Sequence, residues 1–245
     1  MSTGAPPDVI SVDTILFGQS PGYDHGFWND GHAYKVGPHS NQEPGLSEEF
    51  RHSARNVGAD VQSVLERALA QSLKVCGTEL GNVQLMNWHA GYLEIKTQRG
   101  FHDEFLNFFE RVNFGDGSAC ARALKSRKPV IVEDVPLDPE FRFCSAIMQR
   151  AGVRAVQSTP LVSRHGAFVG VLSTHFPESH RPTDLQIDAI ADIAHSAADA
   201  IIRLRAEAEA RASATIQSSL KILDEAKRVM GQAEEVLKRG RELFS

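Results

Sequence analysis

The C-terminal part of the chain carries an apolar repeat that is longer than one compact domain can bury. From Ile190 onward, small or apolar residues recur at alternating intervals of three and four, apart from one four–four step across Ala208. This spacing predicts a helix with a heptad seam and a single stutter, which locally relaxes a supercoil. The seam positions are Ala194, Ala197, Ile201, Leu204, Ala208, Ala212, Thr215, Ser219, Ile222, Ala226, Val229, Ala233 and Val236.

The length of this helix indicates that its distal half needs a partner. No proline follows Pro182, so at ~1.5 Å per residue the helix would reach about 90 Å. We therefore predict that residues 208–245 form a coiled coil, with a parallel homodimer as the natural solution. The many alanines and two hydroxyls leave the seam weak enough for other registers. The alternative is a helical hairpin that folds back at a break around residues 213–218.

Residues 1–45 differ in composition from the rest of the chain. They are rich in Gly, Pro, Asp, Asn and His and contain few aliphatic clusters. Such a segment does not bury enough apolar surface to offset the entropy of ordering it, which predicts a flexible N-terminal arm. His25, His32 and His39 lie on this arm at intervals of seven. No cysteine or closely spaced carboxylate completes a ligand set there, so we predict no metal site.

Residues 46–207 alternate between helical and strand patterns. Apolar residues three and four apart predict helices, and alternating apolar and polar residues predict strands. Strands in hairpins with helices at both ends indicate an α+β domain built on an antiparallel sheet of about five strands. The expected helices cover residues 47–77, 102–112, 118–126, 138–152 and the segment from Pro182, and the expected strands cover residues 83–88, 92–97, 129–135, 154–162 and 167–176.

Charge and cysteine content exclude several classes of protein. The chain has 26 Lys and Arg against 31 Asp and Glu, a formal net charge of −5, which argues against a broad basic surface for nucleic acid. The 3 cysteines form no disulfide framework and indicate a reducing compartment. Neither a signal peptide nor an apolar run of ~18 residues is present. We therefore expect a soluble cytoplasmic protein that binds neither nucleic acid nor membrane.

Two hydroxyl pairs lie in the two strands expected at the centre of the sheet. Ser158-Thr159 and Ser173-Thr174 are adjacent residues, and adjacent strand residues face opposite sides. One hydroxyl of each pair must therefore face away from the helix-covered side, where a buried hydroxyl needs a partner. A small polar ligand or an ordered water would supply one. The alternative is that the hydroxyls pair with each other across the strands.

Three further residues near these strands are candidates for ligand binding. Arg154, at a strand start, could hold an anionic group through two hydrogen bonds. Asp134 would add an acceptor, and His175 a titrating group. The alternative for Arg154 is a surface salt bridge, and the alternative for His175 is a surface position at a strand end.

A series of short motifs through this region resembles the GAF domains of bacterial signalling proteins. The resemblance covers roughly Leu46 to Glu207. The motifs, in chain order, are Asn82-Val83-Gln84-Leu85, Gln98-Arg99-Gly100-Phe101, Gly115-Asp116-Gly117-Ser118-Ala119-Cys120, Val132-Glu133-Asp134-Val135, Asp138-Pro139, Ala151-Gly152-Val153-Arg154-Ala155-Val156-Gln157-Ser158-Thr159-Pro160-Leu161 and Leu172-Ser173-Thr174-His175-Phe176.

The resemblance implies an antiparallel sheet of five to six strands, with terminal helices on one face and a ligand pocket on the other. It implies a small-molecule-sensing or regulatory protein that relays a signal through dimeric terminal helices. The signal would pass within the dimer or to a signalling partner. We expect no enzymatic output from the chain itself. Cys120, after the Gly115-Asp116-Gly117 turn, completes the candidate ligand set. The ligand itself is not implied, because such pockets accept many small molecules.

Two alternatives to a sensor remain open. Free methionine-(R)-sulfoxide reductases are also GAF-fold proteins, and Cys120 and Cys144 occupy places similar to two of their cysteines. In such an enzyme one thiolate would attack the sulfoxide, and the second thiol would then resolve the oxidised cysteine by forming a disulfide with it. However, Cys144 lacks the acidic neighbours of that family, and Cys76 lies too far upstream to be its third cysteine. The other alternative is a structural dimerisation module whose vestigial pocket is filled by its own side chains.

Overall fold

The computed structural model describes the backbone of residues 48–243 and the side chains of residues 58–239 and 241. The predicted flexible arm, residues 1–45, lies outside the described residues. The chain divides by its contacts into a first unit that ends at Arg205 and a second that begins at Ala206. The first unit contains the sheet and the short helices, and it is described before the second.

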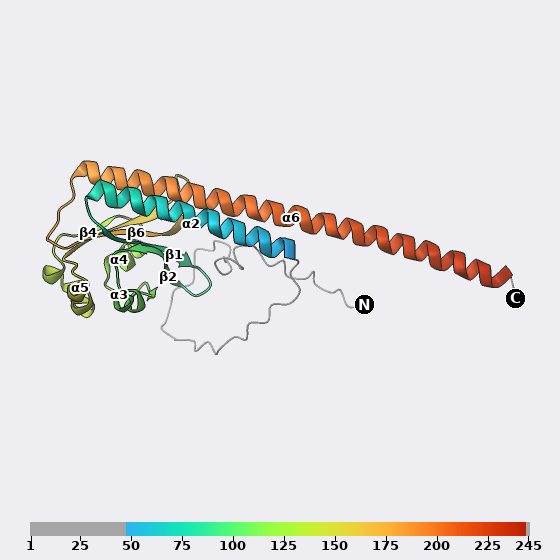
Figure 1. The fold of residues 1–245 in the computed structure, drawn as a ribbon, viewed down its shortest axis with the longest axis horizontal. Helices are drawn as coiled ribbons and strands as arrows, with labels where there is room; N and C mark the ends of the chain where they lie inside the picture. The colour runs from blue at the N-terminus through green and yellow to red at the C-terminus, as the bar shows by residue number, and fades with distance from the viewer. Residues whose placement is uncertain (1–47, 244–245) are drawn as a thin grey trace. The chain divides into compact units, whose positions relative to one another are not determined.

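Within residues 48–243, six strands form one antiparallel sheet, as the sequence predicts (Figure 1). The strand order is β3-β2-β1-β6-β5-β4, so the hairpins β1–β2 and β5–β6 meet at the centre of the sheet. The bounds are Leu80–Asn87 for β1, Tyr92–Arg99 for β2, Arg111–Val112 for β3, Val130–Val132 for β4, Ala155–Val162 for β5 and Phe168–Phe176 for β6.

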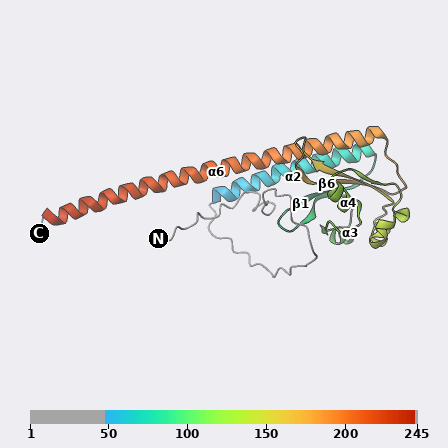
Figure 2. The same ribbon diagram turned by 180° about the vertical axis from the view of Figure 1, so that it is seen from behind.

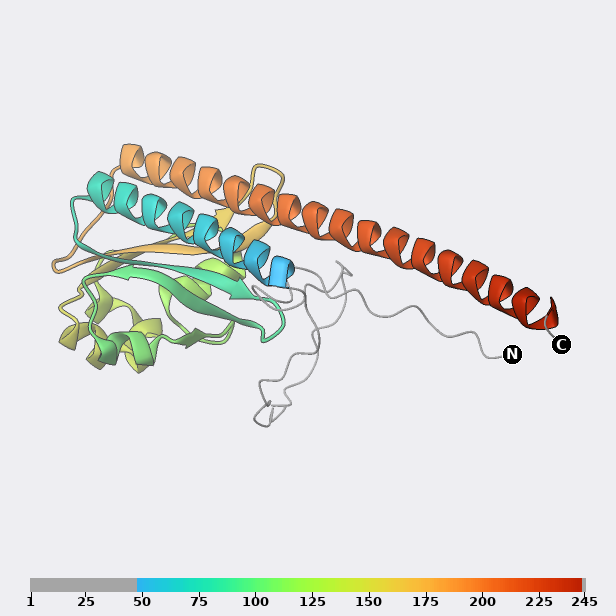
Figure 3. The same cartoon turned by 45° about the vertical axis from the view of Figure 1, so that its right-hand side comes forward.

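One face of the sheet is covered by two helices, α2 (Glu48–Cys76) and the first part of α6 (Asp184–Leu243), which lie side by side (Figures 1, 2 and 3). Leu65, Leu69 and Leu73 of α2 are buried, and so are Ile190, Ala194 and Ile201 of α6. Burial at intervals of four and seven, which return to the same side of a helix, explains why these segments are helical and how they are oriented. At Gly81 of β1 a Cβ atom would lie 2.8 Å from Leu73 Cδ2 of α2 and 2.9 Å from the backbone oxygen of Ser173, so glycine helps α2 and β6 to pack closely against β1.

The other face carries the short elements between the two hairpins. They are α3 (Asp103–Phe108), α4 (Ala119–Ser126), η1 (Val135–Leu137), η2 (Pro139–Phe143) and α5 (Ser145–Arg150). They enclose a core cluster with the sheet that includes Phe105, Leu124, Phe141 and Met148. The domain is therefore an α+β sandwich in which long terminal helices and short internal elements lie on opposite faces of the sheet.

Two of the predicted helices are shorter than expected. The helix predicted over residues 102–112 ends at Phe108, and the chain then adds the two-residue strand β3 to the sheet edge. The helix predicted over residues 138–152 is divided into η2 and α5. Cys144 separates them with φ −115° and ψ 6°, outside the α-helical region. Turns that follow tertiary packing in this way are poorly encoded by apolar periodicity.

Helix α6 runs without interruption from Asp184 to Leu243, so the hairpin broken around residues 213–218 is wrong. The second unit consists of the rest of this helix from Ala206, and large apolar side chains are exposed along it. They are Ile216, Leu220, Ile222, Leu223, Val229, Met230, Val236 and Leu237. The coiled coil remains a prediction. Within the part of the chain that the structure describes, no helix is long and apolar enough to cross a membrane.

Candidate ligand pocket

Strand register places three polar side chains in a row across the centre of the sheet. Asn82 of β1 is the cross-strand partner of Ser173 of β6, which is in turn the partner of Ser158 of β5. All three side chains face away from α2 and are buried. The Ser158 and Ser173 hydroxyls are 2.7 Å apart and share a hydrogen bond. The two serines therefore face away from the helices and also pair with each other, which combines the two outcomes that the sequence left open.

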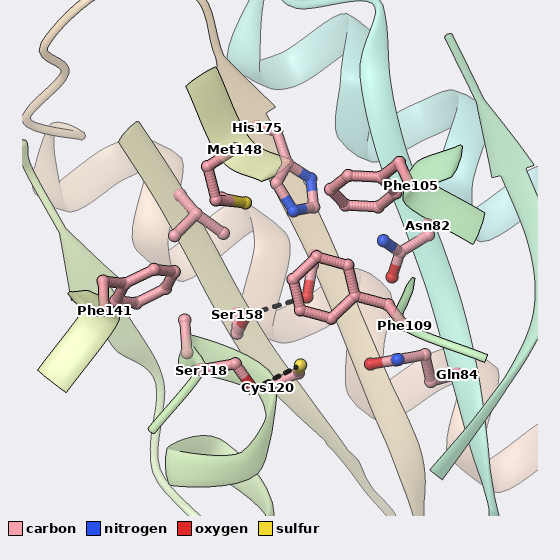
Figure 4. Close-up of a pocket in the computed structure, with 13 residues that line it drawn as sticks. Asn82, Gln84, Phe105, Phe109, Ser118, Cys120, Phe141, Met148, Ser158 and His175 are labelled. Carbon is pink, nitrogen blue, oxygen red and sulfur yellow. Dashed lines mark hydrogen bonds between the residues drawn. The ribbon is translucent and has the colours of Figure 1, made fainter. Parts of the chain in front are cut away.

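This polar row forms part of the wall of a pocket between the sheet and the short internal elements (Figure 4). The cavity volume open to a water-sized sphere is about 20 Å³, which is little more than the room for one water molecule and far below the ~300–1,000 Å³ typical of small-molecule sites. The lining residues are Asn82, Gln84, Phe105, Phe109, Ser118, Ala119, Cys120, Phe141, Met148, Val156, Ser158, Ser173 and His175.

Three polar atoms in the pocket have no hydrogen-bond partner in the protein. They are Asn82 Oδ1, Gln84 Oε1 and His175 Nδ1. The three residues are only 4%, 1% and 5% exposed. Figure 4 shows the polar ends of all three side chains directed toward the middle of the pocket. Because buried polar atoms are almost always hydrogen-bonded, three such atoms around one cavity indicate that a bound molecule, either a ligand or an ordered water, pairs with them.

His175 lies deep in this site and not at the surface, so the surface alternative is wrong. Its ring stands edge-on to Phe101 and Phe105, with centroids 4.9 and 5.8 Å away. Burial lowers the pKa of His175 to about 3, because the imidazolium ion would lose its hydration there. The imidazole is therefore neutral at physiological pH, with one nitrogen that donates and one that accepts.

The two candidate cysteines are protonated thiols at neutral pH. Ser118 is the N-cap of α4, and its Oγ lies 3.2 Å from Cys120 Sγ. Burial raises the pKa of Cys120 above its usual range, and it raises the pKa of Cys144 to about 12. Cys144 Sγ donates to the Phe141 carbonyl at 3.6 Å. Among these thiols, only Cys120 lines the pocket.

Three of the seven predicted ligand residues do not line the pocket. Arg154 binds Asp134 through two hydrogen bonds, Nε to Oδ1 at 3.0 Å and Nη2 to Oδ2 at 2.9 Å. The Arg154 side chain is 56% exposed, so the pair is the surface salt bridge of the alternative interpretation. The guanidinium lowers the pKa of Asp134 by its hydrogen bonds to the carboxylate. Thr159 faces the opposite side of the sheet, where it accepts a hydrogen bond from Gln157 Nε2 at 3.4 Å.

Cys120, Ser158, Ser173 and His175 do line the pocket, and two polar residues there were missed. Asn82 and Gln84 lie two positions apart on β1, so they share a face of the sheet. They belong to a motif used above only for its resemblance. Amides at alternate positions of an otherwise apolar strand were the signal that could have identified them.

Sequence comparison and structure comparison give the same family. Residues 58–202, more than half of the chain, match the sequence model of the GAF domain. The chain belongs to the GAF domain family. Residues 58–202 of the first unit therefore form a GAF domain. No curated protein matches the chain.

Solved structures share this fold at low sequence identity. A domain assigned to a two-component sensor histidine kinase from Sinorhizobium meliloti 1021 has a TM-score of 0.50 at 22% identity, covering 61% of this chain and 96% of that one. The GAF domain of a phosphoenolpyruvate-protein phosphotransferase from Coxiella burnetii has a TM-score of 0.52 at 16% identity, covering 64% and 93%. The blue-light absorbing form of the Thermosynechococcus elongatus PixJ GAF domain has a TM-score of 0.52 at 15% identity, covering 64% and 94%.

Proposed function

We propose that this GAF domain senses a small molecule that binds in the pocket between the central strands and the short internal elements. The observation that carries the proposal is the set of unpartnered atoms on Asn82, Gln84 and His175 around one cavity. Leaving a buried polar atom without a hydrogen bond costs roughly 1–3 kcal/mol. A ligand that supplies the missing partners would recover that free energy, which favours the bound state. To enter, it would have to move the short internal elements outward, because the cavity has room for about one water molecule.

The strands that line the pocket also support the terminal helices, which provides a route for a signal. Ser158 faces the pocket, whereas Thr159 beside it faces the helices. At the end of β5, the carbonyl of Val162 lies 2.6 Å from His195 Nδ1 of α6. A ligand that shifts these strands would therefore shift the packing of α2 and α6. We propose that a homodimer formed through the terminal helices transmits this change, within itself or to a signalling partner in the cytoplasm.

Native mass spectrometry of freshly purified protein tests the sensing function and the oligomeric state together. We expect a dimer that carries an additional small mass, which is released when the protein is denatured. Thermal-shift measurements against a fractionated small-molecule extract provide the second readout. If the protein carries no bound mass and no fraction raises its melting temperature, the result would instead support the structural module with a vestigial pocket.

The reductase alternative has less support from the pocket chemistry. Nucleophilic attack on a sulfoxide needs a thiolate, and burial raises the pKa of both Cys120 and Cys144. We expect no thiol-dependent turnover of free methionine sulfoxide by the wild-type protein. Turnover that is lost in Cys144→Ser would establish the enzyme and overturn this expectation.

A further inference from the structure

The pocket contains no charged side chain. Its thirteen lining residues include no Asp, Glu, Lys or Arg. Its one titratable nitrogen group, His175, is neutral near pH 7 because burial lowers its pKa. Arg154, the cation predicted to hold an anion, is bound to Asp134 at the surface. A carboxylate, phosphate or ammonium group on a ligand would therefore find no opposite charge in the pocket.

Charge on the ligand would be costly in such a site. Transferring an ion from water into a buried site is unfavourable unless an opposite charge or several hydrogen bonds replace its hydration. The amides of Asn82 and Gln84 offer neutral partners only. An amide presents either a carbonyl or an NH2 group, so this conclusion holds for either orientation of the side chain.

The placement of the unpartnered atoms limits the ligand further. Asn82 Oδ1 and Gln84 Oε1 are acceptors without donors. They lie two residues apart on one strand, which separates their backbone positions by roughly 7 Å. The remaining wall is apolar, with the rings of Phe105, Phe109 and Phe141. A matching ligand needs N–H or O–H groups at this separation. Because the cavity itself has room for about one water molecule, the apolar or aromatic body of such a ligand would have to move the rings apart and pack between them.

We propose that the pocket binds an uncharged small molecule with an aromatic or apolar body and hydrogen-bond donors that meet Asn82 and Gln84. This inference rests on the proposed function, because it assumes that the cavity is a ligand site. It goes further by specifying the charge and the hydrogen-bonding pattern of the ligand.

The test compares three probes of nearly equal size: benzamide, benzoate and benzamidine, which are neutral, anionic and cationic. Ligand-observed NMR with the full chain measures their affinities. We expect benzamide to bind at least tenfold more tightly than either charged probe. Asn82→Leu or Gln84→Leu should weaken benzamide binding roughly tenfold, as the loss of one hydrogen bond predicts. Thr159→Val, on the opposite face of the sheet, is the matched control and should bind benzamide like the wild type.

The outcomes separate this inference from the proposed function. Preferred binding of benzoate or benzamidine, or a charged ligand in the native mass spectrum, overturns the inference and leaves the sensor intact. Failure of all three probes, together with the absence of a retained ligand, overturns both. Unchanged benzamide binding in folded Asn82→Leu and Gln84→Leu variants would also overturn the inference, because the two amides would then have no role.

A second inference comes from the exposed face of the distal helix and does not depend on the pocket. Three adjacent rows of residues, each with a spacing of seven, run along this face between residues 215 and 240. They differ in side-chain size. The small row is Ser219, Ala226, Ala233 and Gly240, the β-branched row is Thr215, Ile222, Val229 and Val236, and the large row is Ile216, Leu223, Met230 and Leu237.

The sizes of these side chains favour an antiparallel pair over a parallel one. In a parallel pair in register, each residue faces its own counterpart, so layers such as Ala226 and Ala233 would leave space unfilled. In an antiparallel pair centred near Gly231, Ala226 faces Val236 of the second copy and Val229 faces Ala233. Each layer then joins one small and one branched side chain, which fills the space evenly and preserves dispersion contacts.

Charge selects the same arrangement. Glu225 and Arg239 flank the seam on the same side, fourteen residues apart. The antiparallel pair centred near Gly231 brings Glu225 of each copy beside Arg239 of the other. A shift of the centre by one heptad toward the N-terminus would instead place Glu225 beside Glu225 and Arg211 beside Arg239. In a parallel pair, Glu225 would lie against Met230, without an opposite charge.

The geometry points to antiparallel pairing of this helix with a second copy of the chain, which differs from the parallel pair expected from the heptads alone. Cross-linking tests it with full-length Ala226→Cys and Val236→Cys proteins under mild oxidation. We expect little disulfide dimer from either variant alone and a mixed disulfide when the two are combined. The wild type, with its three native thiols, is the background control.

Charge reversal provides an independent readout by sedimentation. Glu225→Lys should weaken self-association at least tenfold, and Arg239→Glu in the same chain should restore it. Glu234→Lys, at a position outside the seam, is the matched control and should associate like the wild type; Glu235 is unsuitable because it already pairs with Arg239 in the same helix at 2.7 Å. Disulfide dimers of each single cysteine variant would show a parallel pair and overturn the inference. A weak dimer has a Kd of roughly 100 µM. A full chain that still sediments as a monomer at that concentration would also overturn the inference.

Discussion

At the scale of single residues, His175 is the group whose protonation should most affect the stability of the domain. The imidazole lies among aromatic rings and next to no charged side chain of the pocket. Burial lowers its pKa to about 3, whereas an exposed histidine in the unfolded chain has a pKa of about 6.5. Between these values the unfolded chain binds a proton that the folded domain does not. Stability should therefore fall as pH falls below ~6.5, by about 1.4 kcal/mol per pH unit.

We predict that the free energy of unfolding decreases by roughly 2 kcal/mol more between pH 7 and pH 5 in the wild type than in His175→Asn. Urea unfolding at both pH values measures this difference. Carboxylates such as Asp134 also lose stability on protonation, but they are present in both proteins and cancel in the comparison. Equal pH dependence in the two proteins would mean that His175 is not held neutral by burial.

Two of the predicted pocket residues followed from a local rule, whereas Cys120 followed from the resemblance and His175 from its place on the strand. Alternation along a strand placed one hydroxyl of each pair away from the helices, and it is Ser158 and Ser173 that line the pocket. No local rule indicated that Arg154 would bind Asp134, twenty residues away in sequence. The burial of His175 likewise depends on Phe101 and Phe105, which reach it only through the fold.

At the scale of elements, the contact between the two hairpins depends on Gly170 of β6. A Cβ atom there would lie 2.1 Å from the carbonyl oxygen of Gln84 and 3.0 Å from Leu85 Cα. Both neighbours are backbone atoms of β1, so no side-chain movement can relieve the overlap. Because Gln84 also lines the pocket, this contact helps to fix the shape of the pocket.

We therefore predict that Gly170→Ala destabilises the domain by at least about 2 kcal/mol, since β1 and β6 must separate to admit the methyl group. Chemical denaturation followed by circular dichroism measures the change. The control is Gly231→Ala in the exposed helix, where a Cβ atom meets nothing within 4 Å. That substitution should preserve or slightly raise helix content. A stable Gly170→Ala domain would show that the two hairpins have more freedom than this packing allows.

The sequence predicted elements well where periodicity was sustained and less well where tertiary contacts decided. The long helices and the two hairpins were identified because each repeats its pattern over eight residues or more. The segment 138–152 has helical spacing, yet it breaks at Cys144. At the start of this segment, the Asp138 side chain accepts a hydrogen bond from the Glu140 amide and pairs with Arg122 of α4 at 2.7 Å. These contacts hold residues 139–143 in the 3-10 turn η2.

At the scale of the whole molecule, the chain divides between a unit that holds the core and a helix that exposes its apolar side chains. With the exception of Ala208, every buried apolar residue among those described lies before Ala206. The large apolar residues of the distal helix are exposed and none of them lines the pocket, and it is these residues that we assign to self-association. Ligand binding and self-association should therefore be separable properties, coupled only through α6.

We predict that a chain ending at Arg205 remains folded and binds any ligand that the full chain binds, because the sheet, the pocket and every described buried apolar residue except Ala208 are retained. The same chain should lose self-association, because the three rows that we assign to the antiparallel pair are removed. Circular dichroism, native mass spectrometry and sedimentation measure the three properties. Full-length Glu225→Lys is the control, since it should weaken association without shortening the chain. A truncated chain that still forms dimers would place the interface in the first unit, and the signal would then pass directly between the helices that cover the sheet.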